Sequence, residues 1–309
     1  MAIKRIQNRI AESRMSLSLA SIYALLVWFA AGTIEHERWL EFAFMIVSTY
    51  LMVELNNVNA LIRIYSRMVS CSFIFLTSMV CSRFITVESS ILQLAFIAFY
   101  YLSFFSYQDK QSQGRLFYAF LCLGVASVVF VKVLYLLPFL WILIATNLMS
   151  LTFRSFIASL LGLIVPYWFL AAFEVYEGHF ASFIDHFASL ASFEPLFNYA
   201  SLSIHQIATA AFVIVLALIG IIHFLRTSYN DNIRTRMLYE IFITIDLGCI
   251  AFLVLQPTYY NDLLALIIIN TSPLIAHYVA LTKTMITNIS FFLILLTTLL
   301  LTAFNIWMA

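Results

Sequence analysis

The sequence predicts an all-α fold, a polytopic transmembrane helix bundle of about 11 helices. Two observations lead to this prediction. Of the 309 residues, 63% are apolar and 10% are charged, whereas soluble proteins average about 45 to 50% apolar and about 25% charged residues. The apolar residues also form continuous runs that do not alternate with polar residues. Because a backbone in lipid must make its hydrogen bonds within a helix or a closed barrel, continuous runs favour helices.

Eleven apolar runs approach the length of about 20 residues with which a helix crosses the hydrocarbon. They cover residues 16–33, 40–55, 68–86, 90–107, 116–131, 133–150, 155–175, 205–225, 237–256, 263–282 and 287–306. The runs at 116–131 and 133–150 are short and are parted only by Lys132, so they are either two full spans or a partial hairpin, and the count is about 10 to 12. We expect residues 1–309 to form a single integral membrane domain.

The basic residues predict the orientation of the bundle. With the N-terminus in the cytoplasm, 13 of the 16 basic residues fall on the cytoplasmic side, and Arg38, Arg83 and Lys132 fall outside. The 13 residues are Lys4, Arg5, Arg9, Arg14, Arg63, Arg67, Lys110, Arg115, Arg154, Arg226, Arg234, Arg236 and Lys283. Since cytoplasmic segments retain Lys and Arg, this division predicts an N-in, C-out protein. The formal net charge of +1 predicts no nucleic-acid partner.

Two segments outside the apolar runs are predicted to form amphipathic helices. Residues 2–15 are basic and are expected on the cytoplasmic surface. In the outer loop 176–204, aromatic residues recur at helical spacing, and Asp185 and His186 are among its polar residues. Such a helix lies in the membrane interface, where it either roofs a binding cavity for a lipid-linked sugar or an isoprenoid chain or only seals the outer end of the bundle.

Asp246 is the strongest anomaly in the sequence, because it stands near the middle of the apolar run at 237–256. A carboxyl group at the centre of the bilayer costs about 2.5 to 3.5 kcal/mol on insertion scales. We therefore expect it to face the interior of the bundle. It would serve either as a proton or cation relay and substrate contact, or as a neutral acid that is hydrogen-bonded for packing.

The first outer turn carries a second set of candidate residues, Glu35, His36, Glu37 and Arg38. Two carboxylates beside an imidazole could coordinate a divalent cation or supply a general base. The alternative is a solvated turn between two helices.

Lys132 and Arg83, at the predicted outer ends of helices, could contact a pyrophosphate group or could extend to lipid phosphates. Asp185 and His186 are further candidate substrate contacts. The four cysteines are interpreted as buried apolar residues, and no resident metal site is predicted.

The run at 116–173, with a Lys and a Pro before LW and a basic residue before SLLGLIVPYW, resembles uncharacterised multi-pass inner-membrane proteins of Bacteroidota. It is more distantly similar to the membrane-embedded C-type glycosyltransferases, which use polyprenyl-phosphate sugars. The first resemblance implies a bacterial inner-membrane location. The second implies a catalytic acid in the first outer loop, where Glu35 and Glu37 are the matching positions.

Three functions follow from these patterns. The first is envelope-glycan work on a polyprenyl-linked substrate, with Glu35 or Glu37 as base or as ligand of a divalent cation. The second is a transporter or flippase that uses Asp246. The third is a non-catalytic membrane scaffold. No soluble-enzyme motif decides whether the protein is an enzyme.

Overall fold

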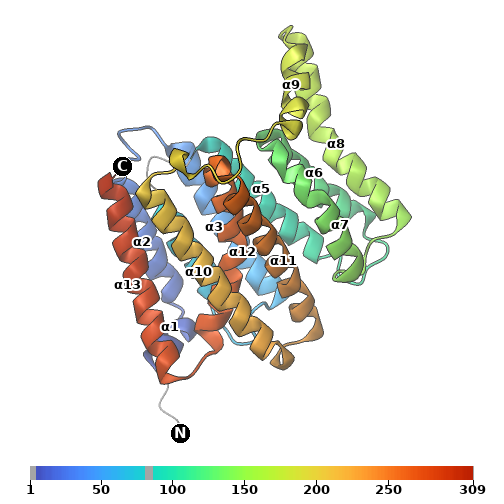
Figure 1. The fold of residues 1–309 in the computed structure, drawn as a ribbon. Helices are drawn as coiled ribbons and strands as arrows, with labels where there is room; N and C mark the ends of the chain where they lie inside the picture. Colours follow the sequence, from blue (N-terminus) through green and yellow to red (C-terminus); the bar gives the residue numbers. More distant parts are fainter. Residues whose placement is uncertain (1–4, 81–85, 309) are drawn as a thin grey trace. The chain divides into compact units, whose positions relative to one another are not determined.

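The computed structural model describes residues 5–80 and 86–308, and these residues form helices without a strand, which confirms the all-α class (Figure 1). The α-helices are α1 (Ile6–Glu12), α2 (Ser16–Ala30), α3 (Trp39–Asn59), α4 (Met68–Val80), α5 (Val87–Phe104), α6 (Gln113–Val129), α7 (Leu137–Thr146), α8 (Phe153–Tyr176), α9 (Phe180–Ala191), α10 (Ile204–Thr227), α11 (Ile233–Leu255), α12 (Tyr260–Leu281) and α13 (Met285–Met308). Short 3-10 helices are η1 (Val131–Leu136), η2 (Tyr199–Ser201), η3 (Ser228–Asn230) and η4 (Pro257–Tyr259).

Each of the eleven predicted apolar runs overlaps an α-helix. The run at 133–150 holds only part of η1 and the short helix α7, and residues 81–85 of the run at 68–86 lie outside the described residues. Six helical segments of the described chain are long and apolar enough to cross a membrane, namely α5, α8, α10 with η3, α11, η4 with α12, and α13. The number is seven if α1 and α2 count as one broken span. Their length and composition are those of a membrane protein.

The chain divides into two compact units. Unit 1 comprises residues 1–87, 202–246 and 267–309, and unit 2 comprises residues 88–201 and 247–266. The boundaries between the units fall inside α11 and α12, so each of these helices contributes to both.

Unit 1 is built around α4, which packs against α2, α3 and α13. Most of the residues of α4 are buried. A close approach between α10 and α12 depends on Gly220, because a Cβ atom at this position would lie 2.8 Å from the Cβ of Leu274. An apolar cavity of about 260 Å³ lies within the unit, and Ala20, Phe75 and Leu295 are among its lining residues.

Part of the predicted helix at 2–15 is present as α1, while residues 2–4 lie outside the described residues. Helix α1 caps the C-terminal end of α12. The axes of α1 and α2 differ by 89°. Gln7 Nε2 donates to the carbonyl of Val279 at 2.5 Å, and Asn8 Nδ2 donates to the carbonyl of Thr282 at 2.9 Å. Because the last four carbonyls of a helix have no partner within the helix, these side chains satisfy groups that would otherwise need water.

Unit 2 is organised by a close contact between α6 and α8. Glycines occur at the contact on both helices: a Cβ at Gly162 would lie 2.2 Å from the carbonyl oxygen of Phe117, and a Cβ at Gly124 would lie 2.7 Å from that of Leu163. The chain has only seven glycines, yet two of them form this seam. Small residues allow two helix backbones to approach each other, as is common in membranes.

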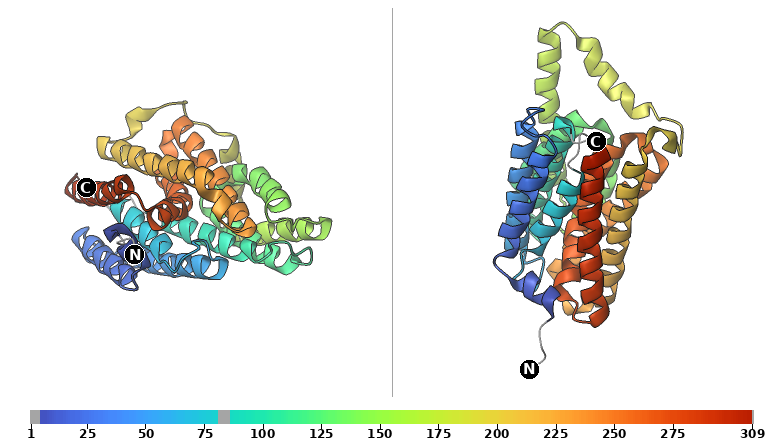
Figure 2. Two further views of the ribbon diagram at one scale, coloured as in Figure 1. Left: turned by 90° about the horizontal axis from the view of Figure 1, so that it is seen from below. Right: turned by 90° about the vertical axis from the view of Figure 1, so that its left-hand side faces the viewer.

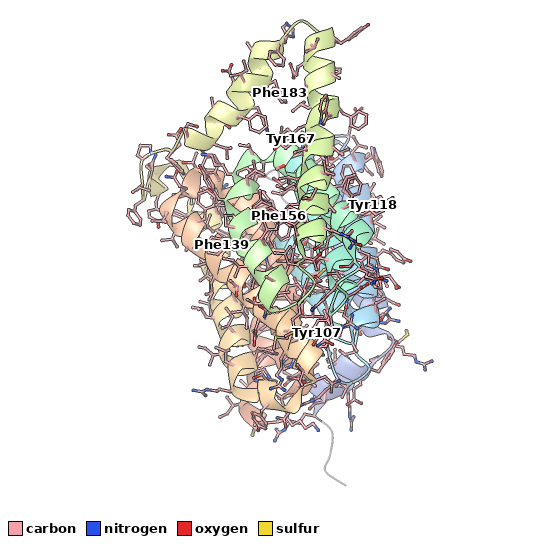
Figure 3. The ribbon with its side chains drawn as sticks, turned by 90° about the vertical axis from the view of Figure 1, so that its right-hand side faces the viewer. Tyr107, Tyr118, Phe139, Phe156, Tyr167 and Phe183 are labelled. Carbon is pink, nitrogen blue, oxygen red and sulfur yellow. The ribbon has the colours of Figure 1, made fainter. Side chains whose placement is uncertain are left out.

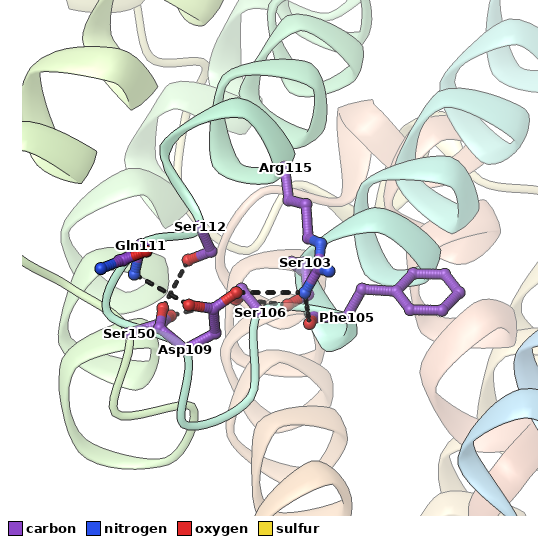
Figure 4. Close-up of polar contacts among 8 residues, drawn as sticks. All are labelled: Ser103, Phe105, Ser106, Asp109, Gln111, Ser112, Arg115 and Ser150. Carbon is purple, nitrogen blue, oxygen red and sulfur yellow. Dashed lines mark hydrogen bonds and ion pairs between the residues drawn. The ribbon is translucent and has the colours of Figure 1, made fainter.

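The segment at 116–150 forms α6, η1 and a helix α7 of only 10 residues. Loops at the ends of α5 and α7 are joined by polar contacts (Figure 4). Ser106 Oγ lies 3.0 Å from Ser150 Oγ, and Arg115 donates to the carbonyl of Phe105 at 2.5 Å and forms an ion pair with Asp109 at 3.3 Å. These contacts join the loop after α5 to the loop after α7 and to the start of α6.

Helices α8 and α9 form a hairpin within unit 2, shown in lime and yellow in the right-hand view of Figure 2. The predicted helix in the outer loop is thus present as α9, and it is amphipathic. Tyr167 on α8 and Phe183 on α9 lie between the two helices (Figure 3). The ring of Tyr167 is 4.9 Å from that of Phe187, so aromatic contacts join the hairpin.

Candidate functional site

Asp246 lies on α11 and its exposed fraction is 0%. Thr271 Oγ1 on α12 donates a hydrogen bond to Asp246 Oδ2 at 3.1 Å. The other carboxyl oxygen, Oδ1, is buried and has no hydrogen-bond partner. The carboxyl group therefore faces protein, as its cost in lipid requires, and only one of its two oxygens is satisfied.

The part of α12 opposite Asp246 is polar. Asn270, Thr271 and Ser272 are consecutive and fully buried, and Pro273 follows them. Proline has no backbone N–H, so the normal helical bond from this position to the carbonyl of Ile269 cannot form. Ser272 Oγ donates to the carbonyl of Ile268 at 2.5 Å, which uses its hydroxyl within the helix. The stretch of α12 beside the buried acid is thus polar, and one backbone hydrogen bond of the helix is missing there.

Tyr239 extends the polar contact between α11 and α12 away from Asp246. Its hydroxyl donates to the carbonyl of Pro273 at 3.3 Å, and its ring lies 5.1 Å from that of His277. Tyr239 and Asp246 are seven residues apart, and two turns of helix place them on one face about 10.5 Å apart along the axis. The site therefore continues toward the end of unit 1 at which α11 begins.

The predicted acidic turn is exposed. Glu35, His36 and Glu37 lie between α2 and α3, with Glu37 at φ 52° and Gly32 at φ 81°. Gly32 allows the left-handed conformation that ends α2, since it has no Cβ atom. The structure places the two glutamates in unit 1, on a solvated turn.

Lys132 lies in η1 of unit 2 and only 3% of it is exposed. Its ammonium donates to the carbonyl of Ser192 at 2.7 Å and to the hydroxyl of Tyr259, and it lies 3.9 Å from the centre of the Tyr259 ring. The ring of Phe193 is also nearby, at 5.2 Å. Lys132 therefore joins η1 to the segment after α9 and to η4 through protein groups.

The polar residues of α9 have different surroundings. Asp185 is exposed. His186 is half-buried, its ring lies 5.9 Å from that of Tyr167, and its Nε2 atom is sheltered without a partner. Burial lowers the pKa of His186 below the ordinary value of 6.5, because the charged imidazolium loses hydration. Arg83 lies outside the described residues.

These positions distribute the candidate residues between the two units. Glu35, Glu37 and Asp246 belong to unit 1, and Lys132, Asp185 and His186 belong to unit 2. Within residues 5–80 and 86–308, no group of three or more His, Cys, Asp and Glu side chains is arranged to hold a metal ion.

Sequence reasoning missed a buried cluster formed by Arg63, His223, Asp231 and His277 in unit 1. The available signal was the histidine at 277 inside an apolar run. Its partners are far away in the sequence, and Asp231 stands in a connector that reads as an ordinary solvated loop.

Comparison with known proteins finds no family model that matches the chain, and no curated protein or solved structure with significant similarity to it.

Proposed function

We propose that this protein is a multi-pass inner-membrane transporter in which the carboxyl group of Asp246 binds the coupling proton or cation. One observation supports this proposal above the others: Asp246 is completely buried, and one of its oxygens has no partner. Several other buried side-chain atoms of the described residues also have no partner, among them Gln7 Oε1 and Ser48 Oγ, but Asp246 differs because it is an ionisable group within an apolar run. A group that is loaded and unloaded during a transport cycle would account for an acid at this position.

A packing role explains the geometry less well. An acid that only joins two helices would gain most by satisfying both oxygens, since a buried unsatisfied oxygen costs about 1 to 3 kcal/mol. The single hydroxyl of Thr271 leaves this cost in place. Ionisable residues inside membrane bundles mark ion or substrate pathways by default.

The surroundings on α12 agree with a transport site. Polar residues at membrane depth are tolerated where they are buried in protein or line a cavity. The consecutive residues Asn270, Thr271 and Ser272 are polar and fully buried, and Pro273 follows them within the helix. Glycan handling has no comparable support, because the Lys132 ammonium already donates to two protein oxygens in place of a pyrophosphate.

The proposal includes about eleven membrane-crossing helices with the N-terminus in the cytoplasm. In Figure 1, α1 and the start of α11 lie at the same end of unit 1. The segments at this end are rich in basic residues. They are Arg5, Arg9, Arg14, Arg63, Arg67, Arg226, Arg234, Arg236 and Lys283. Contacts join these segments: Arg5 donates to the carbonyl of Lys283, and Arg234 donates to Asn59.

Reaction with dicyclohexylcarbodiimide tests the proposal without knowledge of the substrate. This apolar reagent modifies protonated carboxyl groups, and peptide mass spectrometry locates the adduct. We expect the reagent to modify Asp246 in membranes. If the coupling ion is a proton, the rate of modification should decrease as pH rises. If it is a metal cation, the rate should decrease when sodium is added. Asp262, a largely buried acid that accepts from Ser89 at 2.8 Å, is the matched control.

Two outcomes would contradict the proposal. The first is no modification of Asp246 under conditions in which Asp262 or another carboxyl reacts. The second is a rate at Asp246 that does not depend on pH or sodium, because a carboxyl group that only packs helices together would not exchange its proton with either aqueous phase.

A further inference from the structure

A buried cluster of titratable side chains lies at the basic end of unit 1. His277 Nε2 on α12 lies 3.0 Å from Asp231 Oδ2, and both side chains are nearly inaccessible, with exposed fractions of 0% and 2%. Arg63, in the loop between α3 and α4, places its guanidinium 3.6 Å from Asp231 Oδ1 and keeps 38% of its side chain exposed. The ring of His223 on α10 lies 5.4 Å from that of His277.

The charges of this cluster are balanced when both histidines are neutral. Arg63 compensates the carboxylate of Asp231, and the neutral imidazole of His277 donates its Nε2 proton to the same carboxylate. This arrangement leaves His277 Nδ1 as a buried acceptor with no partner. The atom is a site for one further proton. The second imidazole, on His223, lies 5.4 Å from the ring of His277 and is only half-buried.

The groups that face His277 come from four elements. Arg63 comes from the α3–α4 loop, His223 from α10, Asp231 from the connector before α11, and Tyr239 from α11. On α12 itself, the neighbouring Tyr278 packs on the ring of His223 at 5.3 Å. One anionic group and one permanent cation therefore act on two imidazoles. A metal cation would be repelled by the guanidinium beside the only carboxylate.

Tyr239 lies between the cluster and Asp246 along α11. This tyrosine contacts the ring of His277 and donates to the carbonyl of Pro273. His277 lies six residues after Thr271, the donor to Asp246, or about 9 Å along α12. Buried polar groups of unit 1 thus occur at intervals between the basic end and Asp246.

We propose that His223, Asp231 and His277 form a second proton-binding site and that a proton is the coupling ion. This inference rests on the transport function proposed for Asp246. A proton from water binds an imidazole nitrogen and gives an imidazolium held by Asp231. Its release regenerates the neutral ring and protonates the carboxylate of Asp246. No other reactant is required. His277 and Asp231 are the sites of exchange, and Arg63 is a positioning residue that holds Asp231 beside His277.

Proton movement into vesicles tests this inference. Purified protein is reconstituted with a pH-sensitive dye inside, and a potassium gradient with valinomycin imposes a membrane potential. We expect acidification by the wild type, at least a tenfold slower rate for His277→Gln and Asp231→Asn, and a changed pH dependence for His223→Gln. The control is His205→Gln, at the opposite end of α10, which should keep the wild-type rate.

A second measurement is independent of transport. In protein with ¹⁵N-labelled histidine at a fixed pH, we expect Asp231→Asn to change the Nε2 chemical shift of His277, because the ring loses the carboxylate that it contacts. The variant Asp246→Asn should leave that chemical shift unchanged. This measurement also serves if His277→Gln fails to fold.

The outcomes separate this inference from the proposed function. If Asp246 reacts with the carbodiimide in a pH-dependent or sodium-dependent way but His277→Gln and Asp231→Asn move protons at the wild-type rate, the second site is wrong and the transport function stands. The second site is also wrong, and the transport function still stands, if wild-type protein moves protons no faster than protein-free vesicles do. If Asp246 shows neither dependence, the transport function itself fails.

Discussion

Lys132 and Asp246 are two ionisable side chains that are buried among apolar helices, and the structure surrounds them differently. Lys132 in unit 2 meets a carbonyl, a hydroxyl and two aromatic rings. Asp246 in unit 1 meets one hydroxyl and has an oxygen without a partner. A charge that is fully surrounded by fixed partners stabilises the fold, whereas one with free capacity can bind something else. The comparison separates a structural lysine from a candidate functional acid.

The largest expected effect is that of Asp246→Asn on function. The amide keeps the shape and the hydrogen bond from Thr271 but cannot release or bind a proton. We expect carbodiimide modification and proton movement to fall to background, while the free energy of unfolding changes by about 1 kcal/mol or less. Asp246→Glu, which keeps the acid, should retain part of the activity. A fully active Asp246→Asn protein would contradict the functional role of Asp246 that separates it from Lys132.

Lys132→Met should have the opposite profile. Methionine fills the space of the aliphatic chain but leaves the carbonyl of Ser192 and the hydroxyl of Tyr259 without their donor. We expect a loss of about 2 kcal/mol of stability, measured as easier denaturant unfolding and faster proteolysis in the 176–204 loop. Proton movement per folded molecule should be unchanged. The milder control is Tyr259→Phe, which removes one partner only.

Thr271→Val sharpens the comparison by removing the single donor to Asp246. Valine has nearly the same shape, so the helix contact should persist at a cost of about 1 kcal/mol. The carboxylate then loses the bond that favours it, and the pH at which carbodiimide modification declines should move upward. Thr271→Ser keeps the hydroxyl and should behave as the wild type. An unchanged pH profile in Thr271→Val would show that the bond to Asp246 has no role.

The smallest effect is expected at His186, whose surroundings are intermediate between the two. Its folded pKa is below the unfolded value of 6.5, so the stability of the α9 contact is full above that value and decreases as pH falls through it toward the folded pKa. Relative to the intrinsic exchange rate of amides, which itself slows as pH falls, the protection of residues 180–191 should decrease modestly between about pH 7.5 and about pH 5.5. His186→Gln should lose this dependence while other loops remain unaffected.

Much of the helix pattern could be predicted because lipid imposes one physical demand on every run. Eleven apolar runs became helices, and the amphipathic pattern located α9. Asp246 was recognised for the same reason, since an acid in an apolar run has no other explanation than a contact inside the protein. The extra helix α1 was also anticipated from its basic pattern.

The tertiary partners could not be predicted in this way. Asp231 and His277 are 46 residues apart, and Arg63 comes from a different part of the chain. Composition does not indicate which loop packs on which helix end. The protein contacts of Lys132 could not be predicted for a related reason: the segment after α9 supplies the carbonyl of Ser192, and η4 supplies the hydroxyl of Tyr259. The division into two units depends on the same long-range contacts.

The capping of α12 by Gln7 and Asn8 has a consequence for biosynthesis. Their acceptors at Val279 and Thr282 are made more than 270 residues later. The segment that contains α1 must therefore wait for α12 during translation. These contacts of unit 1 form only after α2, α3, α4, α10 and α11 have been made, so a bulky insertion beside α1 would interfere with a late step of assembly.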